Sequence, residues 1–494
     1  MNEAGEADLQ RIAGDWLGRN YSQLEVHPFP EVAVGEARAD RSVIPAVGDV
    51  GGVQFPEIRE TTLENGLRLV VAERDALPLI NVQIVSESGS TTTGKVEDGI
   101  LAEGSWFLRD KGTARYDANE LAAAKDAIAM QVGLYPGDER STLSYSILTT
   151  YLDDSLAIAN ELLVHPTYPE DELAKFRTQA EASLANREKN PGQSAGSYFS
   201  RAIWGEDKAI ASIWTAGHLA QLTAENLKNF GESNVMPSNT TVYMVGDITL
   251  EEAGKAAKKA FGRWTSGAEP RRVAIGEALA PTARVILVDQ PGSVQANIRA
   301  GHRLPPYRAE DFTELAVMNG VFGGSFEARI NMNLREDKGW SYGMRSGIAQ
   351  NTSGDMVLTV SGSVQIDKAA ESMQEILKEF QEFISTRPGT NAEFDREILN
   401  RTRSIPGRYE TSSGFLGSMV AADAYGLPMD YAESQAERLA ALTLEGVNAR
   451  AEDSLHPDHI TWVVVGDLSQ MEESIRALEL GDVEVWDHDG NKVR

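Results

Sequence analysis

Runs of apolar, strand-forming residues mark short strands in two parts of the chain, and helical patterns of apolar and polar residues lie between them. In the first part, strand-forming runs occur at 68–71 and 240–247. In the second part, they occur at 284–287 and 460–467. Asn65-Gly66 directly precedes the first of these runs, and this dipeptide predicts a β-hairpin.

Between the strands, apolar residues recur every three or four positions, as they do on one face of an amphipathic helix. The predicted helices cover 119–132, 154–164, 171–187, 224–230, 250–261, 369–385, 392–403, 444–454 and 470–478. Strands at both ends of each part, with helices between them, predict an α+β fold. We expect two homologous α/β sandwich domains, with mainly antiparallel sheets covered by helices.

The chain is predicted to contain a duplication, because matching segments follow each other at nearly constant spacing. Leu219–Thr223 resembles Leu439–Thr443, which lies 220 residues further along. The closing strands of the two parts are also 220 residues apart, and the opening strands are 216 residues apart. Several ordered matches at one spacing indicate two copies of a domain of ordinary size.

We therefore predict four regions: an N-terminal extension over 1–50, a first domain over 51–264, a linker over 265–282 and a second domain over 283–494. The linker is rich in Gly, Ala and Pro and lacks periodicity. We expect the extension to wrap the body of the protein, and contact with a partner is the alternative. A short helix within it is predicted by one apolar stripe: Leu9, Ile12, Trp16 and Leu17.

Composition excludes several classes of function. The net charge is −28, so the phosphates of a nucleic acid would be repelled. There are no cysteines, which excludes disulfides, thiol catalysis and cysteine metal sites. No run of apolar residues is long enough for a membrane span.

One segment carries the candidate chemistry: residues 323–343, GGSFEARINMNLREDKGWSYG. Ser325 is predicted to be the N-cap of a helix, and Gly339 suits the position that ends it. A buried stripe on this helix is predicted by residues spaced by four: Phe326, Ile330 and Leu334.

This segment places Arg335 in the last helical turns and Tyr342 at the start of an extended stretch. Both side chains could point into one groove, where a guanidinium and a phenol would donate hydrogen bonds to a peptide carbonyl. Taken alone, the two residues favour an ordinary structural explanation, because arginine complements a helix C-terminus and tyrosine is common in strands.

The histidines do not form a recognisable metal or catalytic motif. His456 and His459 are separated by Pro457, which prevents the regular helical pair that a zinc site uses. The others are isolated in the sequence and are expected at the surface or in packing: His27, His165, His218, His302 and His488. No persuasive Ser-His-Asp set is present.

The duplicated layout and the pattern Gly323-Gly324, Leu334-Arg335-Glu336 and Gly339-x-x-Tyr342 resemble the M16 metallopeptidase family, M16B type. The resemblance extends over nearly the whole chain. It implies that Arg335 and Tyr342 bind the substrate backbone beside a zinc centre.

Active members of this family carry His-x-x-Glu-His on a helix of the first copy and a further glutamate on a later helix. The corresponding region here, Gly99–Thr113, has Glu103 but no histidine. On the later helix, Ala182-Ser183 lies where the glutamate is expected, and Glu181 is predicted to face another side. We therefore expect no metal or other cofactor in this chain.

The resemblance implies a non-catalytic, substrate-binding subunit of a heteromeric zinc metallopeptidase, inactive alone. Its partner would be a homologous catalytic subunit bearing His-x-x-Glu-His and zinc, and its substrates would be peptides or unfolded proteins. One alternative is a scaffold subunit without a role in proteolysis. Another is a self-sufficient enzyme with an unfamiliar site.

The N-terminus has neither the basic nor the apolar region of a signal peptide. With the family resemblance, this favours a bacterial periplasmic protein in its mature form, and a cytoplasmic protein is the alternative. Cleavage specificity, the partner's identity and the stoichiometry do not follow from the sequence.

Overall fold

The computed structural model describes residues 5–17, 53–187, 189–266, 282–306, 309–352 and 354–494. The chain divides into two compact units, 1–49 and 50–494. In the first unit, α1 (Glu6–Trp16) confirms the predicted helix, and the side chains of its apolar stripe are exposed. The remainder of the predicted extension, 1–4 and 18–50, lies outside the described residues, and with it the expectation that the extension wraps the body.

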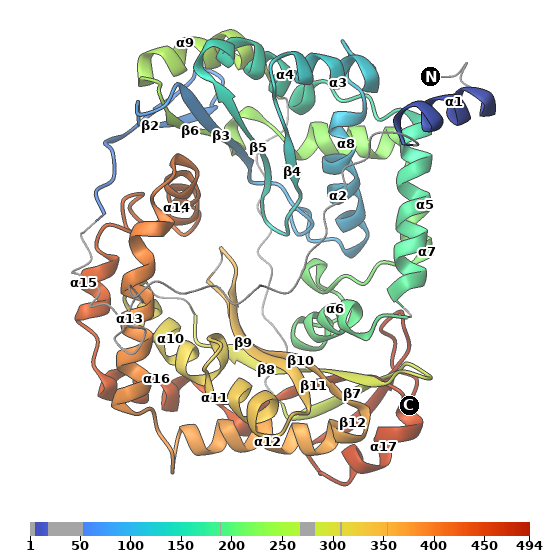
Figure 1. The fold of residues 1–494 in the computed structure, drawn as a ribbon, viewed down its shortest axis with the longest axis vertical. Helices are drawn as coiled ribbons and strands as arrows, with labels where there is room; N and C mark the ends of the chain where they lie inside the picture. Colours follow the sequence, from blue (N-terminus) through green and yellow to red (C-terminus); the bar gives the residue numbers. More distant parts are fainter. Residues whose placement is uncertain (1–4, 18–52, 188, 267–281, 307–308, 353) are drawn as a thin grey trace. The chain divides into compact units, whose positions relative to one another are not determined.

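The second unit contains two six-stranded sheets (Figure 1). The strands of the first sheet are β1 (Ile58–Thr62), β2 (Arg68–Glu73), β3 (Leu79–Ser86), β4 (Gly133–Tyr135), β5 (Ser141–Leu148) and β6 (Thr240–Gly246). Those of the second are β7 (Arg284–Asp289), β8 (Gln295–Leu304), β9 (Ser341–Gln350), β10 (Met356–Gln365), β11 (Thr461–Gly466) and β12 (Asp482–Trp486).

The strand orders are β1-β2-β6-β3-β5-β4 and β12-β7-β11-β8-β10-β9. They are equivalent for five strands, and only the edge strands β1 and β12 differ in origin and direction. In the first sheet β2 and β6 are parallel, in the second β7 is parallel to both β11 and β12, and the other pairs are antiparallel. The predicted fold, with two similar and mainly antiparallel sheets, is confirmed. The predicted hairpin is also present between β1 and β2, where Gly66 adopts a φ of 91°.

Helices surround both sheets. Those before the expected linker are α2 (Gly99–Phe107), α3 (Ala118–Ala127), α4 (Leu152–Val164), α5 (Glu170–Arg187), α6 (Pro191–Trp204), α7 (Ala216–Leu219), α8 (Ala224–Asn234) and α9 (Leu250–Phe261). Those after it are α10 (Ala309–Asn319), α11 (Arg329–Asn331), α12 (Ala369–Phe383), α13 (Asn391–Arg408), α14 (Ser412–Ala424), α15 (Gln435–Ala440), α16 (Leu444–Ser454) and α17 (Leu468–Arg476). Among the described residues, none of the helices combines the length and the apolar character needed to cross a bilayer.

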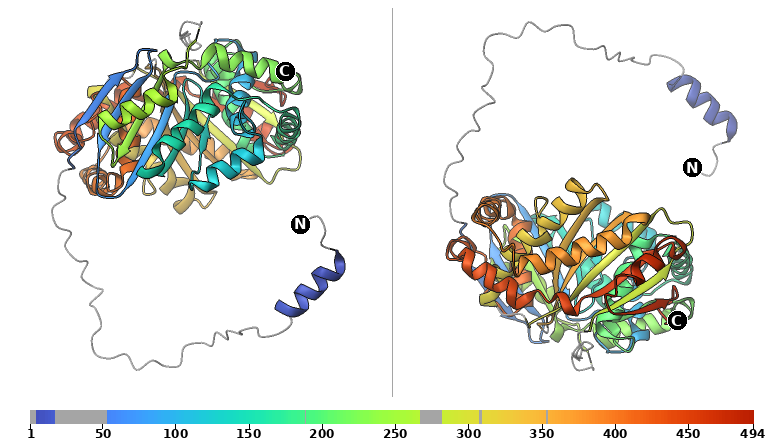
Figure 2. Two further views of the ribbon diagram at one scale, coloured as in Figure 1. Left: turned by 90° about the horizontal axis from the view of Figure 1, so that it is seen from above. Right: turned by 90° about the horizontal axis from the view of Figure 1, so that it is seen from below.

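Each sheet is covered on its second face by a helix from the other half of the chain (Figures 1 and 2). In β2, Leu69 and Val71 belong to the core of their own half, whereas Val70 and Ala72 pack against Phe415 and its neighbours on α14. In the same way, α6 covers β7 and β11 of the second sheet. This exchange makes the two halves one packed unit.

Polar contacts reinforce the packing of α14 on the first sheet. The Asp423 carboxylate lies 2.7 Å from the Arg68 guanidinium of β2 and also accepts a hydrogen bond from the Tyr243 hydroxyl of β6. Near the other edge, Glu139 accepts hydrogen bonds from the backbone and hydroxyl of Thr352, each at 2.7 Å. Most of the expected linker, 267–281, lies outside the described residues, so the predicted domain boundaries stay predictions.

Candidate functional site

The segment that contains Arg335 is helical, and much of it is π-helical. A π-helical turn over Gly320–Gly324 continues α10, and a second π-helical stretch, Met332–Asp337, continues α11. π-Helical turns are rare in proteins, and many of those that occur lie at functional sites. The structure confirms that Arg335 lies in the last turns of a helix.

Two details of the predicted helix are wrong. Ser325 is not its N-cap: Ser325 is extended, its hydroxyl donates to the Gly320 carbonyl at 3.0 Å, and the helix begins after Ala328. Ile330 and Leu334 are buried as predicted, but the Phe326 side chain is 52% exposed. Phe326 lies in the turn before the helix, so helical spacing does not place it in the core.

The end of the helix follows the prediction. Gly339 has a φ of 66°, a conformation that glycine adopts without a steric penalty. Its N–H donates to the Arg335 carbonyl at 3.1 Å, and the N–H of Trp340 donates to the Leu334 carbonyl at 3.0 Å. These bonds satisfy the last carbonyls of the helix and direct the chain into β9.

A β-bulge determines the direction of Tyr342. Ser341 pairs with Val364 and Met344 pairs with Gly362, so β9 contains one more residue than β10 between these pairs. In a regular strand, Tyr342 would share the face of Met344, which is fully buried. The extra residue breaks the alternation, and the Tyr342 side chain is 89% exposed.

Arg335 also reaches the surface, with 38% of its side chain exposed. Its Nε lies 3.3 Å from a carboxylate oxygen of Glu336, and its Cζ lies 4.7 Å from the centre of the Phe326 ring. Within the part of the chain that the structure describes, no hydrogen bond or ring contact joins Tyr342 to Arg335. The structure thus exposes both predicted residues and brings Arg335 onto Phe326.

Sequence reasoning missed the buried residues that position this segment. The Asn331 amide donates to the Phe326 carbonyl at 2.8 Å and accepts from the Met344 N–H at 3.1 Å. A Cβ at Gly323 would lie 2.5 Å from the Ser346 hydroxyl, so only glycine allows the π-helical turn to approach β9 this closely. An asparagine inside an otherwise apolar helical stripe was the available signal, since buried amides are usually hydrogen-bonded.

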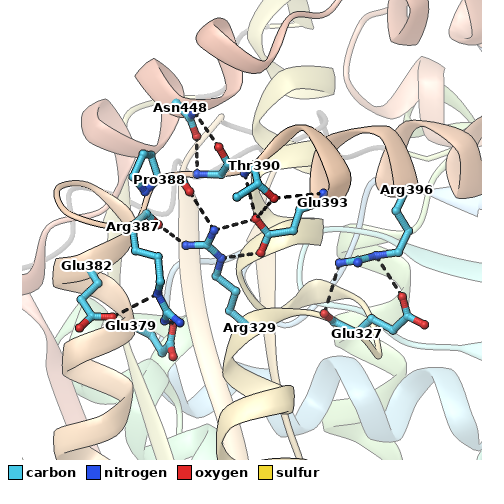
Figure 3. Close-up of polar contacts among 11 residues, drawn as sticks. Glu327, Arg329, Glu379, Glu382, Arg387, Pro388, Thr390, Glu393, Arg396 and Asn448 are labelled. Atoms are coloured by element: carbon cyan, nitrogen blue, oxygen red, sulfur yellow. Dashed lines mark hydrogen bonds and ion pairs between the residues drawn. The ribbon is translucent and has the colours of Figure 1, made fainter.

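The start of the Arg335 helix, at α11, is anchored by a network of charged residues, shown in Figure 3. Arg329 on α11 contacts both carboxylate oxygens of Glu393 on α13, each at 2.7 Å. It also donates to the carbonyls of Arg387 and Pro388. Burial raises the pKa of Glu393, but the hydrogen bonds from Arg329 and Thr390 outweigh it and lower the pKa to about 2.

This network lines a hollow of about 760 Å³, together with Met332, Asn333 and Glu336. Arg335 itself does not line the hollow. The buried guanidinium of Arg329 is fully engaged by protein groups, as a buried charge must be if it is not to destabilise the fold. We therefore regard the hollow as part of the scaffold beneath Arg335.

The helix expected to correspond to the zinc-binding helix is present as α2, but its side chains do not fit a zinc ion. The helix contains no histidine, whereas the zinc motif needs two imidazoles four residues apart. Burial, with a smaller contribution from Asp138, raises the pKa of Glu103 to about 7, which disfavours the ionised form that binds metals. Phe107 instead contacts Phe176 on α5, with ring centres 6.5 Å apart.

On α5, Glu181, Ala182 and Ser183 are exposed, and none of them is close to a set of metal ligands. Among the described residues, no group of three or more His, Asp or Glu side chains could hold a metal ion.

One histidine expected to be isolated has a defined environment. The Nε2 atom of His302 accepts a hydrogen bond from the His456 N–H at 3.1 Å, and the two rings lie 5.3 Å apart. Burial lowers the pKa of His302 to about 4. His302 is therefore a neutral packing residue.

Comparison with known proteins finds similarity to one family of peptidases. Residues 221–400 match the family described as the Peptidase M16 inactive domain. The zinc protease YmxG of Bacillus subtilis, described as uncharacterised, is 24% identical over 327 residues, which cover 65% of this chain and 78% of that protein. A Helicobacter pylori protein described as the non-peptidase homolog YmxG is 20% identical over 409 residues, covering 81% and 91%.

Solved structures show the same fold. A peptidase M16 inactive domain from Pseudomonas fluorescens has a TM-score of 0.76 and 20% identity, over 83% of this chain and 98% of that one. The periplasmic protease PqqL from Escherichia coli has a TM-score of 0.72 and 14% identity, over 94% of this chain but 51% of its own. Together with the duplicated sheets, these matches show that the chain has the fold of M16 peptidases and that residues 221–400 resemble the M16 inactive domain.

Proposed function

We propose that this chain is the non-catalytic, substrate-binding subunit of a heteromeric zinc metallopeptidase. A homologous catalytic subunit would provide zinc and the general base, and this chain would present Arg335 and Tyr342 to the peptide at that zinc site. The observation that carries the proposal is that both hydrogen-bond donors are exposed on a segment held by buried side chains, while α2 lacks the histidines that a zinc site needs.

The way in which the two donors are held in place supports a role in binding a substrate. Tyr342 is turned outward by a bulge, and bulges are common beside active sites because they redirect a side chain. The segment that carries Arg335 is held in place by Arg329 and Asn331, both on α11. Such support is what a preorganised binding site requires.

The chemistry assigned to this chain is limited to hydrogen bonding. The guanidinium of Arg335 and the hydroxyl of Tyr342 would donate to the carbonyl oxygen of the bond that the partner cleaves. Donors of this kind stabilise the negative charge that develops on the oxygen, and loss of one typically lowers turnover by about 10²–10³.

The edge position of β9 supports binding of an extended peptide, but only along part of the strand. The N–H of Met344 is bonded to Asn331, and the carbonyl of Ser346 accepts from Asn319 at 3.5 Å. A peptide that adds to the sheet would therefore pair beyond Ser346. Pairing through the backbone would give little preference for sequence.

Reconstitution tests this proposal. The tagged chain is purified from its native host, and co-purifying chains are identified by mass spectrometry. We expect a chain of similar length with His-x-x-Glu-His, and hydrolysis of a quenched fluorescent peptide by the pair but by neither chain alone. A stable assembly without any such chain would favour the scaffold alternative, and hydrolysis by the isolated chain would favour a self-sufficient enzyme.

The periplasmic location remains part of the proposal. It is supported by the fold shared with a periplasmic protease. Fractionation of the native host, with detection of the chain beside markers of each compartment, tests it.

A further inference from the structure

The exposed ring of Phe326 contacts two arginines. The Cζ atom of Arg335 lies 4.7 Å from the ring centre, and that of Arg345, on β9, lies 5.3 Å from it. The buried amide of Asn331 fixes both Phe326 and the strand next to Arg345, through the Phe326 carbonyl and the Met344 N–H. Two cations are thus held on one aromatic group by the fold.

The positive charge of this cluster is only partly balanced. Arg335 pairs with the neighbouring Glu336, whose side chain is itself half-exposed. Arg345 donates to the Met344 carbonyl at 3.2 Å and, among the described residues, forms no ion pair. Burial lowers the pKa of Arg345, and the charge of Arg335 lowers it further.

Two like charges that share one ring repel each other, and an anion between them would remove the repulsion. A carboxylate fits particularly well, because its two oxygens match the donor geometry of a guanidinium. In a chain with a net charge of −28, two neighbouring cations with only one ion-pair partner between them are an unusual feature.

We propose that Phe326, Arg335 and Arg345 form a subsite for a carboxylate of the bound peptide. The carboxylate would belong either to an acidic side chain or to the peptide C-terminus, and the exposed Phe326 ring would contact the adjoining aliphatic atoms. This inference rests on the proposed function, because it takes the surface around Arg335 as the place where the peptide lies. Arg345 is then a specificity-determining residue.

The test uses the full chain and four fluorescently labelled peptides of one sequence. The peptides carry either Glu or Gln at one internal position, and their C-terminus is either free or amidated. Fluorescence anisotropy gives the dissociation constant of each peptide for the wild type, Arg345→Gln and Arg345→Lys. Arg115→Gln is the matched control, since it removes a guanidinium that lies 5.0 Å from the Tyr116 ring, far from this segment in the sequence.

For the wild type we expect one carboxylate to tighten binding about five- to tenfold, the effect of one well-placed charge-assisted contact. Arg345→Gln should abolish the preference, Arg345→Lys should retain part of it, and Arg115→Gln should retain all of it. The arm that shows the preference, internal or terminal, identifies the source of the carboxylate. Higher salt should weaken the preference, because the cluster is exposed.

Equal binding of all four peptides to the wild type, or an unchanged preference in Arg345→Gln, would overturn the subsite while leaving the proposed function intact. If the wild type bound none of the four peptides, both the subsite and the proposed function would be overturned. The two failures are therefore distinguishable.

Discussion

The side-chain carbonyl of Asn331 accepts a hydrogen bond from the backbone N–H of Met344 at 3.1 Å, and this bond joins the Arg335 helix to the strand that presents Tyr342. The same side chain donates to the Phe326 carbonyl. Asn331 is completely buried, so water cannot replace either bond. The relative placement of the candidate site residues therefore depends on a residue that cannot touch the substrate.

Replacement of Asn331 by Ala should lower the free energy of unfolding by about 1–3 kcal/mol, because the Phe326 carbonyl and the Met344 N–H lose their partner. Urea denaturation followed by circular dichroism measures the change. Asn226→Ala is the control, because the side-chain amide of Asn226 donates a hydrogen bond to the Gln221 carbonyl at an exposed position. We expect this substitution to change the free energy of unfolding by less than about 0.5 kcal/mol. Equal effects of the two substitutions would contradict the role of Asn331.

A methyl group at Gly323 should separate the π-helical turn from β9. The new Cβ would lie 2.5 Å from the Ser346 hydroxyl and 3.0 Å from its backbone nitrogen, so the turn must shift. We expect Gly323→Ala to cost about 1–3 kcal/mol in thermal or urea unfolding. Gly347→Ala on the same strand has open space around its Cβ and should be nearly neutral.

The Arg329–Glu393 pair should make stability depend on acid pH. The folded-state pKa of Glu393 is about 2, below its ordinary value of 4.5, so its stabilisation is complete above about pH 4.5 and is lost as the pH falls towards 2. Near pH 7, Glu393→Gln should lower the free energy of unfolding by about 2–3 kcal/mol.

The difference between wild type and Glu393→Gln should shrink between pH 4.5 and pH 2. Glu251→Gln serves as the control, because Glu251 forms an exposed pair with Lys255 at 2.6 Å and should contribute less than about 0.5 kcal/mol. A difference that stays constant over this pH range would show that Glu393 acts through packing and not through its charge.

Metal removal should affect the proposed catalytic partner but not this chain. We expect a chelator to leave the melting temperature of the isolated chain unchanged, because α2 contains no histidine that could bind zinc. The same treatment should abolish hydrolysis by the paired enzyme, and added zinc should restore it. A chelator-dependent fall in the melting temperature of the isolated chain would reveal a metal site in this chain.

Much of the fold follows from local patterns. The strand runs, the hairpin at Gly66 and the end of the helix at Gly339 were predicted because strand-forming residues and glycine conformation act within a few residues. The equivalent sheet orders follow from the duplication. In contrast, the exchange of α6 and α14 depends on contacts between residues far apart in the chain, which periodicity does not encode.

The candidate site was predicted less completely than the fold. The sequence indicated Arg335 and Tyr342, but it could not indicate the bulge that exposes Tyr342, because the bulge depends on the register between β9 and β10. The exposure of Phe326 and its contact with Arg345 also arise from a turn and a strand that meet only in the folded chain. The prediction from helical spacing that Phe326 is buried is therefore wrong, because spacing along a helix says nothing about this turn.

The most direct measurement is the turnover number of the paired enzyme with Tyr342→Phe, which removes one hydroxyl from a side chain without hydrogen-bond partners in the described structure. We expect kcat to fall by about 10²–10³ while the complex and the melting temperature stay unchanged. Tyr135→Phe, at an exposed position on the edge strand of the first sheet, should leave kcat unaltered. A Tyr342→Phe enzyme that turns over at the wild-type rate would contradict the assignment of half a hydrolytic site to this chain.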